Sequence, residues 1–155
     1  ITAFLGQIMT GRLPQEVARR ARTLLRITDE YESVSDEAVS LLKMLRRMRT
    51  HRLVLPDETR QALLRVHDLT ARFAAAINEA VRDEPDHAPN RLIHMKADAA
   101  HVKALIAETR NALLVRLETP GSNALKIVAC MDILNAYSRI KDYLLNVGET
   151  LVGDK

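Results

Sequence analysis

The sequence predicts an all-α protein, an antiparallel four-helix up-down bundle. Three observations lead to this fold class. The composition combines 47% hydrophobic and 28% charged residues with only five glycines and five prolines, which favours helix over strand. Apolar residues recur every three or four positions over long segments. Three breaks, at residues 51–57, 83–90 and 118–123, each contain a proline and separate these segments. We therefore expect one bundle domain over residues 13–155, preceded by a remnant or linker at residues 1–12.

The breaks define four expected helices, which span approximately residues 13–50, 56–83, 89–118 and 123–152. Pro14 is compatible with a first helical turn, and Ser122 is a suitable N-cap for the last helix. Because the connections are short, each helix must run antiparallel to the next. The first helix is the longest, so we expect it to extend beyond its partners or to kink near its polar centre.

One apolar stripe on each helix is predicted to form the core. On the first helix the stripe consists of Val17, Ala21, Leu24, Tyr31, Ala38, Leu42 and Leu45. On the second it consists of Leu63, Val66, Phe73, Ile77 and Ala80. On the third it consists of Leu92, Met95, Ala99, Val102, Ile106 and Leu113, and on the fourth of Cys130, Ile133, Tyr137, Ile140, Leu144, Val147 and Leu151.

Charge and aromatic content argue against a nucleic-acid partner. The net charge is +3, the arginines are spread over several segments, tryptophan is absent and aromatic residues make up 3% of the chain. A platform on which bases could stack is therefore poorly supplied. The densest basic cluster, residues 43–52, could bind phosphate groups or a lipid surface. We favour a second interpretation, in which these cations lie at a helix C-terminus and oppose its dipole.

Cysteine usage and hydropathy bear on the cellular setting. Cys130 is the sole cysteine, so it forms no internal disulfide; a reducing compartment and a buried, inert thiol are expected. No apolar run approaches the roughly 20 residues of a membrane span. A chain that starts at Ile1 is expected to be a piece of a longer protein.

The centre of the first helix carries an unusual acidic ridge, which we define as Asp29, Glu32 and Asp36. Side chains three or four residues apart are neighbours on a helix, so these carboxylates repel one another unless a cation or a basic partner meets them. Helical bundles use carboxylates at this spacing to hold divalent metals, but a second helix must supply further ligands. The alternative is an exposed acidic patch paired with Arg or Lys.

Two stretches resemble the signature of PhoU-like proteins: YESVSDEAVSL (residues 31–41) and DILNAYSRIKDYLLNVGE (residues 132–149). In that family each repeat is a three-helix unit with an acidic E/D-x-x-x-D motif on its last helix, where metal ions can bind. The resemblance implies that the first helix corresponds to the last helix of one repeat. The other three helices would then form a complete following repeat.

The resemblance implies metal ligands at Glu32, Asp36 and Asp142, with Zn or Fe as the expected metal and no other cofactor. The first motif keeps both acids, whereas its Arg and Gly positions are Ser33 and Ser35. The second keeps four positions and departs at two. Those kept are Arg139, Ile140, Asp142 and Asn146, and those changed are an acid replaced by Ser138 and a Gly replaced by Lys141. Ser138 is a poor ligand and Lys141 brings a positive charge next to Asp142.

A PhoU-like unit that begins without Met is also similar to the cytoplasmic C-terminal region of bacterial sodium/phosphate cotransporter-like proteins. The resemblance therefore implies a non-enzymatic regulatory domain linked to inorganic phosphate uptake, at the cytoplasmic side of the inner membrane. Its expected partner is the transmembrane transporter part of the same parent chain or a signalling protein, and a homodimer is left open. The alternative is a stand-alone PhoU-type phosphate-signalling regulator that binds a divalent metal.

No motif for catalysis or nucleotide binding is present, since the sequence lacks a Gly-flanked nucleophile and the patterns GxGxxG and GxxxxGK[ST]. We therefore expect no enzymatic activity. One competing hypothesis is a di-metal helical enzyme that combines the acidic ridge with His94, Asp98 and His101, a row on one face of the third helix. It requires the two rows to converge on one ion, and the paired Glu-x-x-His motifs of that chemistry are absent.

Overall fold

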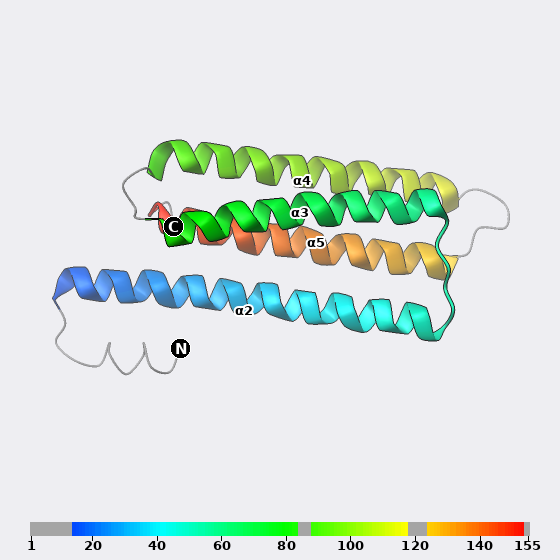
Figure 1. Cartoon of the computed structure of the whole chain (residues 1–155), viewed down its shortest axis with the longest axis horizontal. Coiled ribbons are helices and arrows are strands. Elements are labelled where there is room, and N and C mark those ends of the chain that lie inside the picture. Colours follow the sequence, from blue (N-terminus) through cyan, green and yellow to red (C-terminus); the bar gives the residue numbers. More distant parts are fainter. Residues whose placement is uncertain (1–13, 84–87, 118–123, 154–155) are drawn as a thin grey trace.

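The computed structural model describes residues 14–83, 88–117 and 124–153, and these form four long helices (Figure 1). The helices are α2 (Gln15–Thr50), α3 (Asp57–Arg82), α4 (Ala88–Leu117) and α5 (Ala124–Leu151), and each runs antiparallel to the next. The predicted all-α, four-helix fold is confirmed, and every helix boundary lies within two residues of its predicted position. The predicted linker at residues 1–12 and the predicted N-cap Ser122 lie outside the described residues.

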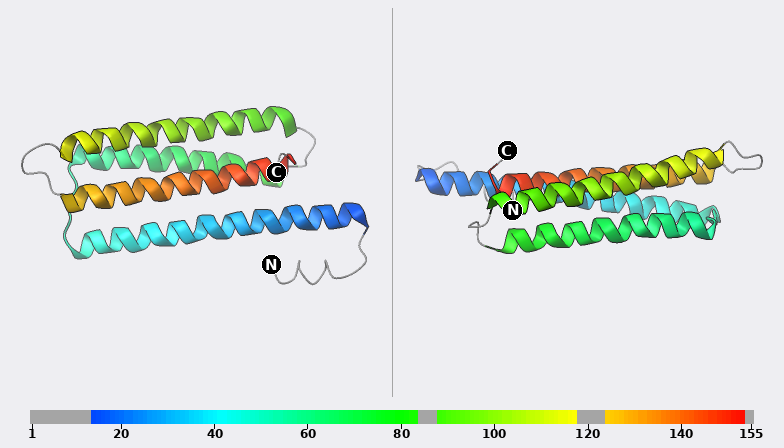
Figure 2. Two further views of the ribbon diagram at one scale, coloured as in Figure 1. Left: turned by 180° about the vertical axis from the view of Figure 1, so that it is seen from behind. Right: turned by 90° about the horizontal axis from the view of Figure 1, so that it is seen from above.

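α5 lies at the centre of the bundle, in contact with each of the other helices (Figures 1 and 2). α3 and α4 pack on each other and on α5, which gives a compact three-helix unit. α2 packs mainly on α5, on the side away from α4, so α2 and α4 lie on opposite sides of the molecule. As expected, α2 extends beyond the end of α5, and it does so as one uninterrupted helix.

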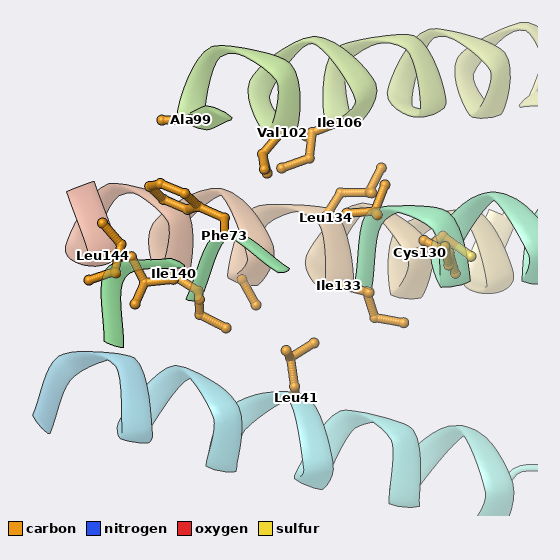
Figure 3. Packing of buried hydrophobic residues seen from close by; sticks show 14 of the residues in the cluster. Leu41, Phe73, Ala99, Val102, Ile106, Cys130, Ile133, Leu134, Ile140 and Leu144 are labelled. Atoms are coloured by element: carbon orange, nitrogen blue, oxygen red, sulfur yellow. The ribbon is translucent and has the colours of Figure 1, made fainter. Parts of the chain in front are cut away.

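The stripes predicted for α3, α4 and α5 form most of the core (Figure 3). α5 adds three buried apolar residues that were not predicted, Ile127, Leu134 and Ala136. Val66 and Ile77 from α3, Val102 from α4 and Val147 from α5 are completely buried. Ala80, Leu92, Tyr137 and Leu151 lie at the edges of this core and are half-buried. The period of 3.6 residues thus identified the buried face correctly on three of the four helices.

The stripe predicted for α2 was largely wrong. Four of its members are exposed, namely Val17 at 44%, Leu24 at 53%, Leu42 at 66% and Leu45 at 50%. Ala38 is also exposed, Tyr31 is half-buried, and Ala21 is buried as predicted. The main α2 residues of the core are instead Ile27, Val34, Leu41 and Met48, which we call the inner seam, and Tyr31 and Met44 pack against the core beside them. The residues of the inner seam are spaced by seven, so they form one row along the helix, and α5 covers that row.

Gly148 allows three helices to approach closely near the end of α5. A Cβ atom at this position would lie 2.7 Å from the sulfur of Met95 on α4 and 3.2 Å from Cδ1 of Ile77 on α3. The first distance is shorter than real Cβ contacts, so a larger side chain would displace its neighbours. Gly148 is therefore the residue that lets α5 lie against α3 and α4 together at this level.

Cys130 is buried in the same core, as predicted. Burial raises the pKa of its thiol to about 11, because the thiolate would lose its hydration. The thiol is therefore protonated at neutral pH and acts as a small apolar side chain.

The connection from α2 to α3 begins with a C-terminal capping motif. The amide of Leu53 donates to the carbonyl of Met48, and the amide of Arg52 donates to that of Arg49, at 2.9 and 3.0 Å. This pair of bonds is the Schellman pattern, whose penultimate residue adopts a left-handed conformation. Arg52 has that conformation, with φ at 51°, although glycine is the residue that adopts it without steric cost.

We expect Arg52→Gly to raise the free energy of unfolding by about 0.5–1 kcal/mol, because glycine removes the Cβ clash of the left-handed conformation. Urea denaturation followed by circular dichroism measures the change. Arg46→Gly is the matched control. Arg46 is exposed inside α2, so this substitution should lower the free energy of unfolding by about 1 kcal/mol, because glycine has a low helix propensity. A loss of stability in Arg52→Gly would contradict the role of this cap.

Candidate interaction surface

Polar pairs on one flank of the inner seam align α2 with α5. The carboxylate of Glu37 accepts two hydrogen bonds from the guanidinium of Arg139, at 2.5 Å from Nε and 2.8 Å from Nη2. One register step away, the side-chain amide of Asn146 donates to Glu30 at 3.0 Å. The acids are seven residues apart, as are their partners, so the two pairs define a single antiparallel register. The hydrogen bonds to Glu37 also raise the pKa of Arg139.

A second polar contact connects α2 to α3. The hydroxyl of Tyr31 donates to Oδ1 of Asn78 at 2.5 Å, and partial burial raises the pKa of Tyr31. A third joins α3 to α5, where Nδ1 of His67 lies 2.9 Å from the hydroxyl of Tyr137. These contacts lie at the surface between helices, so they orient the helices while the apolar core holds them together.

Sequence analysis missed Glu30 and Glu37 as contact residues. It singled out Arg139 and Asn146 only as positions of a family motif, whereas the structure uses both to bind α2. The signal in the sequence is that Glu30 and Glu37 are seven residues apart, as are Arg139 and Asn146. This spacing indicates a contact only if the first and last helices are already known to pack together.

The structure places the predicted ligands Glu32 and Asp36 on the outward side of α2, where both are exposed. Glu32 is nine residues from Leu41. At roughly 100° per residue, this spacing places Glu32 about half a turn around α2 from the inner seam. Asp142 is on α5, with 58% of its side chain exposed, and its carboxylate lies 2.5 Å from Nζ of Lys141.

The three predicted ligands therefore do not come together. In residues 14–83, 88–117 and 124–153, no three His, Cys, Asp or Glu side chains form a group that could hold a metal ion. The cause is the packing of α2, which turns Glu32 and Asp36 away from the helix that carries Asp142. Metal binding by Glu32 and Asp36 without Asp142 stays a prediction.

Lys141 is buried, and only 9% of its side chain is exposed. Its charge is compensated by Asp142, the adjacent residue, because a buried ammonium group needs a carboxylate or hydrogen-bond acceptors. Asp142 is thus the partner of a buried lysine.

The di-metal enzyme hypothesis is contradicted by the helix arrangement. His94, Asp98 and His101 are exposed on α4, and α4 lies on the opposite side of the bundle from α2 (Figure 1). The acidic ridge and the histidine row therefore cannot meet on one ion.

The outward side of α2 combines two features that the bundle leaves unused. The first is the exposed apolar row of Val17, Leu24, Ala38, Leu42 and Leu45, which we call the outer stripe. The second is the acidic ridge beside it, of which no member takes part in a salt bridge within the described residues. The serines of this stretch fit an exposed position, since Ser33 bonds to the helix carbonyl of Asp29 and Ser35 faces solvent.

Comparisons of the chain with protein-family models, curated proteins and solved structures give no match. The similarity to PhoU-like proteins therefore stays a prediction from residues 31–41 and 132–149. In the part of the chain that the structure describes, no helix is both long enough and apolar enough to cross a membrane.

A double-mutant cycle on Glu37→Ala and Arg139→Ala tests the alignment of α2 with α5. We expect a coupling of about 0.5–1 kcal/mol, because the pair is bidentate but Arg139 is 51% exposed and partly screened by solvent. Urea denaturation of the four proteins gives the coupling. The matched pair Glu16 and Arg19, at 63% and 70% exposure on one turn of α2, should couple more weakly, because solvent screens both groups. Equal coupling in the two pairs would contradict a special role for Glu37 and Arg139.

Proposed function

We propose that this chain is a non-enzymatic regulatory and interaction domain of a sodium-dependent phosphate transporter, acting on the cytoplasmic side of the bacterial inner membrane. Its mechanism is surface recognition, in which the outward side of α2 contacts the transporter part of the parent chain or a signalling protein. The phosphate connection is an inference from the PhoU-like resemblance.

The exposed side of α2 is the observation that carries this proposal. Leu24, Leu42 and Leu45 are half-exposed or more, so α2 loses part of the roughly 1.5–3 kcal/mol that full burial of each side chain would contribute. Large apolar side chains gathered on one exposed face are typical of a protein contact site. The arrangement of a three-helix unit with one additional helix also agrees with what the resemblance implies.

Phosphate uptake in cells tests the proposal. In a strain whose parent gene carries Glu32→Lys and Asp36→Lys, we expect sodium-dependent uptake of labelled phosphate, or its repression at high phosphate, to change at least about threefold. The reason is that reversed charges on a recognition surface oppose the native partner and destabilise the complex. Labelled phosphate counted at limiting and at high external phosphate gives the readout.

The matched control for this experiment is Asp98→Lys with Glu108→Lys, which makes the same charge change at exposed positions of α4. These substitutions should leave uptake as in the wild type. If neither pair of substitutions alters uptake or its repression while the protein is present at normal levels, the transport connection is wrong.

A second candidate is a stand-alone PhoU-type phosphate-signalling regulator that binds a divalent metal. The observation in its favour is that Glu32 and Asp36 lie one turn apart, exposed, and outside every salt bridge of the described residues. A partner chain would have to supply the remaining ligands, because one helical ridge offers too few oxygen atoms.

Elemental analysis of the purified protein tests the second candidate. If it is correct, Zn or Fe should be retained through gel filtration, and Glu32→Ala with Asp36→Ala should remove it, because both carboxylates would be ligands. Asp98→Ala with Glu108→Ala is the matched control and should retain the metal. Metal-free wild-type protein after incubation with Zn²⁺ or Fe²⁺ would reject this candidate.

A further inference from the structure

The outer stripe has the spacing of a helix that pairs with another helix. Val17, Leu24, Ala38 and Leu45 are separated by seven or fourteen residues, and Leu42 lies four residues after Ala38. Tyr31 occupies the remaining position of this row, but it is half-buried and bonds to Asn78 on α3. A repeat of seven with a second position three or four residues away is the pattern of knobs-into-holes packing. The inner seam has the same repeat, and α5 covers it. α2 therefore carries a second helix-pairing row beside the inner seam, and most of this row stays exposed, whereas Tyr31 contacts the bundle.

Of the acidic ridge, Glu32 directly flanks the centre of the outer stripe, whereas Asp29 and Asp36 lie further round the helix. Glu32 is a helical neighbour of Thr28 and Ser35, which fill the stripe between its apolar ends, and Asp36 is a neighbour of Val39, which is 46% exposed. Positions that flank an apolar helical seam are those at which charges select the partner. The centre of this face is acidic, and its two ends carry Arg20 and Arg46.

This charge distribution decides between two kinds of partner. In an antiparallel pair of two copies, centred on the ridge, Asp29 would oppose Asp36 of the second chain and Glu32 would lie within one residue of its own equivalent. A parallel pair in register also sets like charges side by side. Like charges at flanking positions destabilise a helix pair, so the face is not suited to itself. A helix with basic residues beside the centre of its apolar stripe complements it.

We propose that the outward side of α2 binds an amphipathic helix whose apolar stripe is flanked, near its middle, by Lys or Arg. The apolar side chains of the partner pack on Leu24, Leu42 and Leu45, and its cations meet the acidic ridge. This inference rests on the proposed function only for the idea that the domain recognises a protein, and it names the chemistry of that partner. An anionic membrane surface is disfavoured by the same carboxylates.

Fluorescence anisotropy with synthetic labelled peptides and the full chain tests the proposal. The probe is a helical peptide of about four heptads with Leu and Ala at the core positions and Lys at the flanking positions of its central heptads. The comparison peptide has Glu in place of each Lys. We expect the Lys peptide to bind at least about tenfold more tightly than the Glu peptide at low salt, and the difference to shrink as salt increases.

Two sets of substitutions separate the two features of the surface. Asp29→Asn, Glu32→Gln and Asp36→Asn should abolish the preference for the Lys peptide. Leu24→Gln with Leu42→Gln should weaken its binding about tenfold or more, since two apolar anchors are removed. The matched control is Ile93→Gln with Val115→Gln on α4, at 66% and 67% exposure in the wild type, and it should bind as the wild type does. Circular dichroism establishes that each variant is folded.

Several results would overturn the proposal. Equal binding of the two peptides, or equal binding by the wild type and the Leu24→Gln, Leu42→Gln variant, would show that this surface is not the site. A wild-type dimer in sedimentation velocity that becomes monomeric in that variant would assign the face to a second copy. Much tighter binding by a chain without residues 1–13 would assign it to that segment. If the Lys peptide binds as expected but the substitutions Glu32→Lys and Asp36→Lys leave phosphate uptake unchanged, this inference holds and the transporter connection is rejected.

Discussion

The burial of α5 is the constraint on which the whole arrangement depends. Eleven of its 28 residues are buried, against four of 36 in α2, because three helices pack around it. Such packing requires small side chains, and Ala136 and Gly148 supply them where neighbouring helices approach. It also requires that buried charge be compensated, which Asp142 does for Lys141. α2, α3 and α4 are therefore placed by the faces that α5 offers to them.

Apolar burial alone would not define how α2 lies on α5, because a row of residues repeating every seven permits a shift of one repeat at modest cost. The pairs Glu37 with Arg139 and Glu30 with Asn146 restrict that freedom, since a shift would separate both pairs. These pairs are half-exposed, so they contribute more to register than to stability. Arg139 and Asn146, which the family resemblance singles out, thus have a structural role in this chain that is independent of any metal.

The position of α2 at the edge of the bundle has a functional consequence. Each helix of the three-helix unit packs on at least two neighbours, whereas α2 has one extensive contact, with α5, and a smaller one with α3 through Tyr31. Its outer stripe and acidic ridge are consequently available together, on a helix that α5 holds along most of its length. A rigid helix that presents a linear surface loses little conformational entropy when a partner binds, which favours recognition.

The sequence by itself determined the four helices, their boundaries and the buried faces of α3, α4 and α5, because each of these helices has one dominant apolar face between proline-containing breaks. It also placed Glu32 and Asp36 side by side, since neighbours on one helix follow from spacing alone. Only the tertiary structure decided which of two rows on α2 faces inward. Both rows repeat every seven residues. Ile27, Leu41 and Met48 are buried and Val34 is half-buried, on the same side of α2 as the acids that pair with α5. The separation of Asp142 from Glu32 and Asp36 follows from that choice, because long-range packing depends on which faces two helices share and no local pattern encodes it.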